Sequence, residues 1–337
     1  MTSTPANIDV SVIIPARNEE GNLEACLHSL VAQAGPTHEI IVVDDHSTDR
    51  TRAIAESFAG VRVISADPLP DRWSGKCNAC WNGAKVAKGK WLLFTDADTR
   101  HASNSIELGL REAESNRAAL LSYSPKQEVH GFWQRALMPV IFAELAKTYR
   151  PKEVSDPASP AAAANGQYLL IRRDAYHAVG GHAAVAHAIL EDVELAKLVK
   201  RTGYQLQFRM SDAVSTRMYR SFRQMWEGWT KNLALLFPHP LWLAAKRLVE
   251  FLLIVACLVG VAVAMEDHDR ISIAINAALL AVLLFFFFRR IQRAHFDWLS
   301  NLLAILGLPL FTLLLLNSYI SHKRGMVRWK GRIYKAD

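Results

Sequence analysis

The sequence predicts an α/β domain with a mainly parallel sheet, followed by a membrane region of apolar helices. Two observations carry this prediction. Short apolar runs alternate with helical patterns as far as about residue 201, which is the order that strands and helices take around parallel sheets. Residues 241–320 are then dominated by long apolar runs, which raise the apolar share of the 337 residues to 51%.

The strands of the first half are identified by short apolar runs that end at proline or at acidic residues. Residues 10–14 form such a run before Pro15, and residues 39–43 form a second run. Between them, apolar residues recur at i, i+3 and i+4 over residues 23–31, which predicts a helix with one buried face. The remaining predicted elements are strands at 61–64, 91–94 and 167–172 and helices at about 76–88 and 189–201.

Four aspartates follow strands at one edge of the expected sheet: Asp44, Asp45, Asp96 and Asp98. In parallel sheets, ligands bind outside the carboxyl ends of the strands. Because side chains alternate along a strand, Asp96 and Asp98 point to the same side, where their charges repel each other unless something neutralises them. We favour a bound Mg²⁺ or Mn²⁺, since these cations take carboxylate oxygens together with substrate phosphates. A solvated turn is the alternative.

The second half contains three apolar segments that approach the length of about 20 residues needed to cross a bilayer: 248–265, 271–288 and 299–320. The acidic loop 266–270 is expected outside, and the arginines that follow the second segment are expected inside, together with the basic end of the chain. Three crossings from a cytosolic start would put that basic end outside. One segment is therefore expected to be re-entrant or interfacial, and Gly307 and Pro309 indicate the third. Another apolar stretch, residues 132–142, predicts either an interfacial helix or ordinary core.

The composition argues against other classes of protein and other kinds of site. The net charge of +7 includes a dense basic group beside the apolar segments, which fits an anionic membrane surface better than nucleic acid. Cys77 and Cys80 form a lone CxxC, so we expect two buried helix residues rather than a zinc site. The polar N-terminus lacks a signal-peptide pattern, which predicts a cytosolic catalytic half. Residues 150–164 hold three prolines without periodicity and predict a loop.

A series of short motifs gives the sequence a family resemblance. In order along the chain they are VSVIIPARNEE at 10–20, VVDDHSTD at 42–49, GKCNACWNG at 75–83, FTDAD at 94–98, GGH at 180–182 and LEDVEL at 190–195. Taken together, this ordered set resembles a GT-A-fold, family 2 glycosyltransferase over roughly residues 8–235. The resemblance implies a Rossmann-like cytosolic domain at 1–235. A membrane region with two or three transmembrane helices at 236–320 and a basic cytosolic tail at 321–337 would follow it.

The resemblance also implies a nucleotide-sugar site. Asp45 would accept hydrogen bonds from the uracil of a UDP-sugar, and Asp44 would help to shape that edge. Lys76 would lie near the phosphates of the donor, and Asp98, helped by Asp96, would hold Mn²⁺ or Mg²⁺ on the diphosphate. The loop expected near the base contributes Pro15, Arg17, Asn18 and Glu19.

Asp192 is the general base that the resemblance implies. Inverting attack at an anomeric carbon requires a base for an acceptor hydroxyl and an electrophile for the leaving diphosphate, and a carboxylate and a metal ion supply these. From the residues alone, Glu191 and Asp192 are better explained as an acid pair at a helix N-terminus, where the helix dipole favours negative charge.

A narrower resemblance concerns the acceptor. LPDRWSGK at 69–76, NGQYLLIRRDAYHAVGGH at 165–182 and MYRSFRQMWEGWTKN at 218–232 are similar to carotenoid- and hopanoid-associated glycosyltransferases. RWKGRIY at 328–334 is similar to the basic aromatic tail of such lipid-directed enzymes. The QxxRW motif of processive synthases is missing. Arg223 and Trp226 could serve a similar donor pocket, or they could belong to an amphipathic helix on the membrane surface.

The expected function is therefore inverting, metal-dependent transfer of a sugar from a nucleotide-sugar, expected to be a UDP-sugar, to the hydroxyl or carboxyl group of a membrane lipid. The expected enzyme is a multi-pass protein of the cell membrane with a cytoplasmic catalytic domain, and nucleic acid is not an expected partner. The alternatives are a polyprenyl-phosphate glycosyltransferase, a processive polysaccharide synthase and a non-catalytic membrane scaffold.

Overall fold

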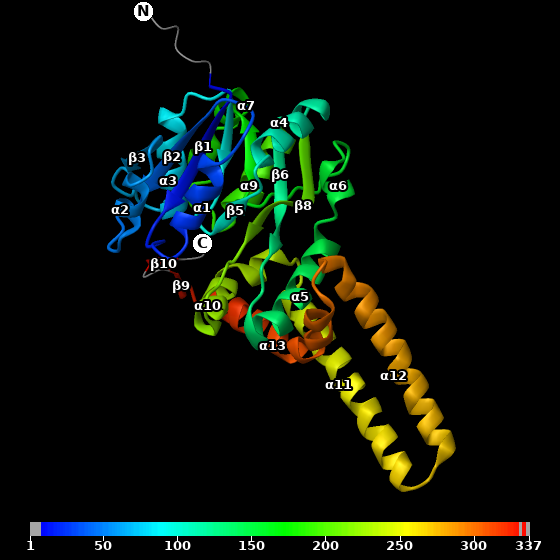
Figure 1. Cartoon of the computed structure of the whole chain (residues 1–337). Coiled ribbons are helices and arrows are strands. Elements are labelled where there is room, and N and C mark those ends of the chain that lie inside the picture. Colours follow the sequence, from blue (N-terminus) through cyan, green and yellow to red (C-terminus); the bar gives the residue numbers. More distant parts are fainter. Residues whose placement is uncertain (1–7, 330–331, 335–337) are drawn as a thin grey trace, which may run out of the picture. The chain divides into compact units, whose positions relative to one another are not determined.

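The computed structural model describes residues 8–329 and 332–334, and the chain divides into two compact units. The first unit comprises Met1–Glu128 and Tyr149–Met218, and the second comprises Val129–Thr148 and Tyr219–Asp337. Two helices that the boundary at 235 would include in the catalytic domain, α5 (Gly131–Thr148) and α10 (Phe222–Asn232), therefore belong to the second unit. Figure 1 labels these elements along the chain.

The first unit is built on one eight-stranded sheet in the order β3-β2-β1-β4-β7-β6-β8-β5. Its strands are β1 (Val10–Ala16), β2 (His38–Asp44), β3 (Val61–Ser65), β4 (Trp91–Phe94), β5 (Thr99–His101), β6 (Leu120–Gln127), β7 (Leu169–Arg172) and β8 (Leu206–Thr216). Strands β3, β2, β1 and β4 run parallel, and β7 then pairs antiparallel to both β4 and β6. This mixed, mostly parallel sheet confirms the predicted fold class.

Eight helices belong to this unit within the described residues: α1 (Leu23–Val31), α2 (Thr51–Glu56), α3 (Gly75–Val86), α4 (Ser105–Ser115), α6 (Pro151–Ser155), α7 (Arg173–Ala178), α8 (Gly181–Ala184) and α9 (Glu191–Arg201). The loop predicted at 150–164 is interrupted by α6, a helix of five residues. Pro151 occupies the first turn of α6, where its missing N–H is not needed, so the prolines of this segment did not exclude a helix.

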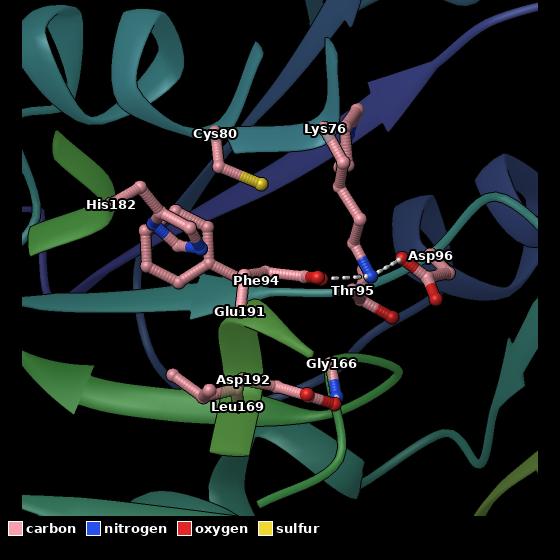
Figure 2. A pocket seen from close by; sticks show the side chains of 11 residues that line it. Lys76, Cys80, Phe94, Thr95, Asp96, Gly166, Leu169, His182, Glu191 and Asp192 are labelled. Carbon is pink, nitrogen blue, oxygen red and sulfur yellow. Dashed lines mark hydrogen bonds and ion pairs between the residues drawn. The ribbon is translucent and has the colours of Figure 1, made fainter. Parts of the chain in front are cut away.

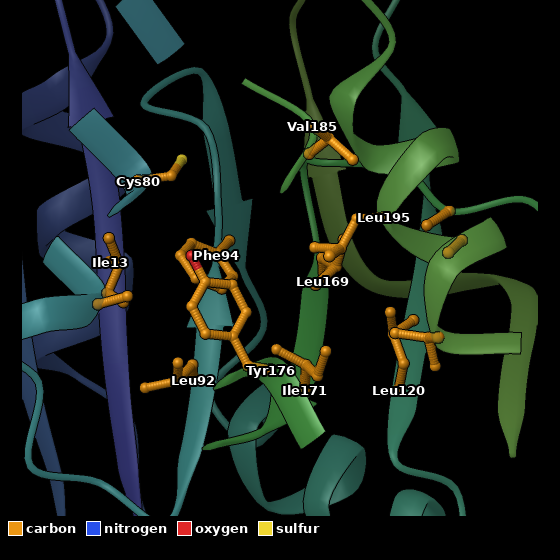
Figure 3. Close-up of a cluster of buried hydrophobic side chains, with 14 of the residues drawn as sticks. Ile13, Cys80, Leu92, Phe94, Leu120, Leu169, Ile171, Tyr176, Val185 and Leu195 are labelled. Carbon is orange, nitrogen blue, oxygen red and sulfur yellow. The ribbon is translucent and has the colours of Figure 1, made fainter. Parts of the chain in front are cut away.

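The strands separate two hydrophobic cores, one on each face of the sheet. Ile13, Leu92 and Phe94 contribute to the core drawn in Figure 3, whereas Val12 and Leu93, their immediate neighbours, contribute to the opposite core. This alternation follows from the two-residue period of a strand. In the described part of the chain all four cysteines are buried and free, as expected for small helix residues. Of these, Cys80 on α3 lies in the core of Figure 3.

The second unit is mainly helical. Besides α5 and α10, its described elements are α11 (Pro240–Glu266), α12 (Arg270–Ile291), α13 (Trp298–Lys323), two short 3₁₀ turns (Leu233–Leu236 and Gln292–Ala294) and the strand pair β9 (Val327–Trp329) with β10 (Arg332–Tyr334). Three helices, α11, α12 and α13, are long and apolar enough to cross a membrane. Figure 1 shows α11 and α12 as a long hairpin. Part of the predicted basic tail, including Lys330 and Lys335, lies outside the described residues.

Candidate active site

The candidate site lies where β4 ends and α3 and α9 begin. Lys76, in the first turn of α3, places its ammonium group 2.8 Å from an Asp96 oxygen and 2.9 Å from a Glu191 oxygen. Figure 2 shows the ammonium group between these two carboxylates. Desolvation opposes the charged ammonium, but the attraction of Asp96 and Glu191 outweighs it and holds the pKa of Lys76 well above its usual value. Three segments far apart in sequence thus meet through one cation.

Asp192 lies beside this cluster, in the first turn of α9. One oxygen accepts a hydrogen bond of 2.8 Å from the backbone N–H of Gly166, and the other accepts one from the N–H of Val193. Desolvation and the neighbouring charge of Glu191 raise the pKa of Asp192 from 3.8 to about 6, although Lys76 and the backbone donors act in the opposite direction. A carboxylate of this kind is still ionised at neutral pH and accepts protons more readily than an ordinary aspartate.

Gly166 is the functional position that the sequence reasoning missed. A Cβ atom there would lie 2.8 Å from Lys76 Nζ and 3.5 Å from an Asp192 oxygen. Only a residue without a side chain lets the backbone approach the charged cluster so closely. Gly166 belongs to the motif at 165–182, but nothing in a single sequence indicates that the N–H of this glycine donates to Asp192.

The inner wall of the pocket is apolar and holds a neutral histidine. Phe94, Leu169, Cys80 and His182 line it together with the charged residues (Figure 2). His182 is buried, its Nδ1 lies 2.9 Å from the Tyr176 hydroxyl, and desolvation lowers its pKa to about 4. An uncharged imidazole leaves Lys76 as the positive group of the pocket lining.

The acid pair after β2 is close to the loop after β1. Asp45 is buried, and its backbone carbonyl accepts a hydrogen bond of 2.9 Å from Arg17, whose guanidinium is also 3.9 Å from the Asp45 carboxylate. Asn18 bonds to the backbone N–H of Thr48 through its side chain. Glu19 donates its own backbone N–H to the hydroxyl of Thr51, and Pro15 lines the same pocket as Lys76 and Asp192. Asp44 is buried with Arg52 3.9 Å away.

The two aspartates after β4 have different partners. Asp96 contacts Lys76, whereas an Asp98 oxygen accepts a weak hydrogen bond of 3.4 Å from the Gln167 amide. Both carboxylates are partly exposed. Among the described residues no group of three or more His, Cys, Asp or Glu is placed to hold a metal ion by itself. Two partly exposed carboxylates do fit a divalent cation that completes its coordination with substrate phosphates.

Comparison with known proteins identifies the family. The sequence model of glycosyl transferase family 2 matches residues 11–180, which include β1, the acid pair after β2, Lys76 and the aspartates after β4. The chain belongs to glycosyl transferase family 2. The resemblance read from the motifs is thereby confirmed, and so is the assignment of the protein as a family 2 enzyme.

Two of the proteins that this family 2 chain resembles match it over nearly its whole length. The 4,4'-diaponeurosporenoate glycosyltransferase of Staphylococcus aureus strain USA300 is 28% identical, over 96% of this chain and 88% of that protein. The mannosyltransferase PcManGT of Pyrobaculum calidifontis, solved with GDP-Man and Mn²⁺, has a TM-score of 0.55 at 16% identity and covers 94% of this chain and 87% of its own. S. aureus TarS 1-349, solved with UDP, has a TM-score of 0.41 at 18% identity and covers 68% of this chain, which spans 65% of TarS 1-349.

Two of the expected donor-binding residues of this family 2 protein are on α10. Arg223 is exposed and forms an ion pair of 2.9 Å with Glu227, and Trp226 stacks near Phe222, with ring centroids 5.8 Å apart. Helix α10 belongs to the second unit, so these residues are described with that unit. Their role in donor binding stays a prediction, as does the role of every other residue predicted for the site.

Proposed function

We propose that this protein transfers a sugar from a nucleotide-sugar to a membrane lipid, with inversion at the anomeric carbon. The arrangement of Asp192, Lys76 and Asp96 is the observation that carries the proposal. It combines a proton acceptor with a pKa of about 6, a permanent cation and a carboxylate open to a metal ion in one pocket. When a hydroxyl attacks the anomeric carbon, a base has to take the proton of that hydroxyl, and positive groups have to stabilise the diphosphate that leaves from the opposite face.

Lys76 is proposed to act on the donor side. In the free protein its ammonium is shared by Asp96 and Glu191, both within 3 Å. A diphosphate brings more negative charge than either carboxylate, so the ammonium would contact the donor when the donor is bound. Asp98 and Asp96 would hold Mn²⁺ or Mg²⁺, which supplies electrophilic stabilisation to the leaving diphosphate. PcManGT, of the same fold, was solved with Mn²⁺.

The nucleotide is proposed to be uridine, recognised at the edge formed by Asp45 and the Pro15–Glu19 loop, because the motifs there resemble those of UDP-sugar enzymes. Guanosine is the rival, since PcManGT was solved with GDP-Man. Titration of the purified protein with UDP and with GDP, each with Mn²⁺, decides between them by calorimetry. At least tenfold tighter binding of UDP is expected, and tighter binding of GDP would replace the donor assignment.

The acceptor is proposed to be a lipid because of the similarity to a 4,4'-diaponeurosporenoate glycosyltransferase and because of the three apolar helices. The name of that relative denotes a carboxylate acceptor, which is already ionised at neutral pH. A hydroxyl acceptor has to lose its proton as it attacks, so it depends on Asp192 as general base. The effect of replacing Asp192 therefore separates a hydroxyl acceptor from a carboxylate acceptor.

The decisive experiment is a comparison of lipids. Wild type, Asp192→Asn and the control Glu194→Gln, which changes an exposed acid on the same helix, are expressed in a host that makes carotenoids and hopanoids. Mass spectrometry of the extracted lipids is expected to show a species heavier by one sugar with wild type and with the control. If no lipid changes, although the protein is in the membrane and releases the nucleotide from its donor, the lipid assignment fails. A polymer or a sugar-linked polyprenyl phosphate would identify one of the rival functions.

A further inference from the structure

Helix α13 has the composition of a membrane span, yet contacts along its whole length connect it to α5, to α10 and to the first turns of α11. Its first residue follows the N-cap Asp297, whose carboxylate accepts hydrogen bonds of 3.1 Å from Arg135 near the start of α5. Asp297 itself comes only a few residues after the end of α12. The N-terminal end of α13 therefore lies beside the first turns of α5.

The middle of α13 is in very close contact with α5. A Cβ atom on Gly307 would lie 1.9 Å from the backbone oxygen of Ala136, so a larger residue would force the two helices apart. Five residues further on, the Thr312 hydroxyl contacts the carbonyl of Ala244 at 3.3 Å, in the first turns of α11. The centre of α13 thus contacts the first half of α5 and the first turns of α11.

The C-terminal end of α13 is connected to α10, the helix that precedes the apolar hairpin. Asn317 donates to the Thr230 hydroxyl at 2.9 Å, and Ser318 donates to the Thr230 carbonyl at 2.7 Å. His322 lies 2.8 Å from the carbonyl of Lys231. Helix α10 carries exposed charged side chains, among them Arg223, and cannot lie in hydrocarbon.

A layer of four charged side chains marks the base of the α11–α12 hairpin. Glu144 of α5 lies 3.2 Å from both Arg247 of α11 and Arg290 of α12, and Glu250 of α11 is paired with both arginines. All four are largely buried inside the unit. Ala244, which contacts the centre of α13, comes before this layer in α11, on the side away from the hairpin tip.

We propose that α13 does not cross the bilayer but lies along its surface, and that α11 and α12 form the membrane-crossing hairpin. A helix of 26 residues is about 39 Å long, so a crossing α13 would have one end near the hairpin tip at Asp267–Asp269. Instead, both ends and the centre of α13 contact residues of α10, of the first half of α5 and of the first turns of α11. None of these residues lies beyond the charged layer toward the hairpin tip. The inference rests on the proposed membrane attachment and goes beyond it by assigning the role of each apolar helix.

The exposed side of α13 fits the boundary between headgroups and acyl chains. Apart from Leu299 in its first turn, its large exposed apolar residues recur at intervals of four or seven, which places them on one stripe: Trp298, Leu302, Leu306, Leu313 and Ile320. The opposite side is buried and includes Gly307 and Ser318. An exposed aromatic cluster of α5 and α10, in which Trp133 stacks near Phe222 at 5.2 Å, supplies the ring types that favour this boundary.

This arrangement predicts on which side each segment lies. An even number of crossings puts the end of α13 and the strand pair β9–β10 on the same side of the bilayer as the start of α11, opposite the hairpin tip. Single cysteines replace Asp267 at the tip and Met326, which is exposed just beyond α13. Parent protein with its four buried cysteines gives the background. An impermeant maleimide is added to right-side-out and inside-out membrane vesicles containing the full chain.

The two cysteines are expected to react in opposite vesicle preparations, D267C in right-side-out vesicles and M326C in inside-out ones. Reaction of both in the same preparation would overturn the proposal, because α13 would then cross or the hairpin would not. Loss of the protein from the membranes in alkaline carbonate would overturn membrane attachment itself. That result is distinct from reaction of both cysteines in the same vesicle preparation. Neither result depends on catalytic activity.

Depth measurements give an independent test. Nitroxides at Leu313 and Ile320 on α13 are compared with nitroxides at Leu279 and Phe286 on α12, two pairs with the same spacing of seven residues and with exposed side chains. The α12 pair is expected to differ in depth by about 10 Å, because a crossing helix rises 1.5 Å per residue. The α13 pair is expected to have equal depth, and a difference of about 10 Å in that pair would overturn the proposal.

Discussion

Replacement of Lys76 by methionine would test the electrostatics of the candidate site most directly. Lys76 lies within 3 Å of Asp96 and Glu191, and its charge also lowers the pKa of the neighbouring Asp192. Methionine keeps most of the length of the side chain and removes the charge together with the N–H donors that contact Asp96 and Glu191. The carboxylates would then repel one another without a neighbouring cation, so the pKa of Asp192 is expected to rise above its value of about 6.

The expected rise in the pKa of Asp192 can be estimated from the loss of the single positive charge of Lys76. Loss of one opposite charge at this range shifts a carboxyl pKa by about 1–3 units, which would place that of Asp192 at about 7–9. At pH 7 the ionised fraction would fall from about 90% to between about 50% and about 1%. The lower ionisation of Asp192 should therefore reduce transfer to a hydroxyl acceptor at pH 7 by about 2-fold to 90-fold, and most of this part of the loss should be recovered at pH 9. The part that comes from the missing contact with the diphosphate should be the same at every pH.

The assay is the pH dependence of kcat/KM for sugar transfer, measured from about pH 5 to pH 9. In the wild type, activity should be lost as pH falls through about 6, because the base becomes protonated. In Lys76→Met this acid limb should move upward. Lys85→Met is the matched control, since Lys85 is on the same helix and its ion pair with Asp67 is exposed.

An acid limb that stays at the same pH in Lys76→Met would refute the reasoning. A uniform loss of activity at every pH would then mean that Lys76 acts only on the diphosphate. A shift of the limb in the Lys85→Met control would show that general surface charge, and not the contact in the pocket, sets the pKa of the base.

Three further predictions concern the general base, the metal ion and the contact between α13 and α5. Asp192→Asn should lower transfer to a hydroxyl acceptor by about 10²–10⁴-fold while nucleotide binding is kept. An unchanged rate would remove the assignment of the base. Asp98→Asn should abolish the stimulation of donor binding by Mn²⁺ in calorimetry, and equal stimulation would remove the metal assignment. Gly307→Ala should lower stability in detergent by about 1–3 kcal/mol, because its Cβ would meet the backbone of Ala136; Leu306→Ala on the exposed side is the control, and equal melting temperatures would contradict the close contact.

Local patterns were sufficient to predict most of the sheet and the position of the acids. The apolar run 91–94 became β4, and the acids after β2 and β4 lie where the ends of parallel strands predicted them. The antiparallel strand β7 beside β4 was not predictable, because strand order depends on contacts between distant segments rather than on any local period. Gly166 precedes β7, so its position also depends on the pairing of β7 with β4. For the same reason, the sequence did not predict it as a partner of Asp192.

Hydropathy was less informative in the second half. The segment 299–320 has the apolar composition of a span, and only Gly307 and Pro309 indicated that it differs from the others. What decides its role is the series of contacts with α5, α10 and α11, and a window of residues contains no information on such contacts. Similarly, the stretch 132–142 was compatible with core or interface. In the structure it belongs to α5, whose Leu137 and Val140 are fully buried within the second unit.

The placement of α5 in the second unit has a practical consequence for anyone who shortens this chain. The chain leaves the first unit after Glu128 and returns at Tyr149, so a cut at residue 235 does not follow a natural boundary. A fragment that ends at residue 235 would keep α5 and α10 but lose α11, α12 and α13. Glu144 would lose both arginine partners, and buried residues such as Leu137 would face water. Such a fragment should aggregate, and a stable soluble form should instead omit α10 as well and replace α5 by a short linker.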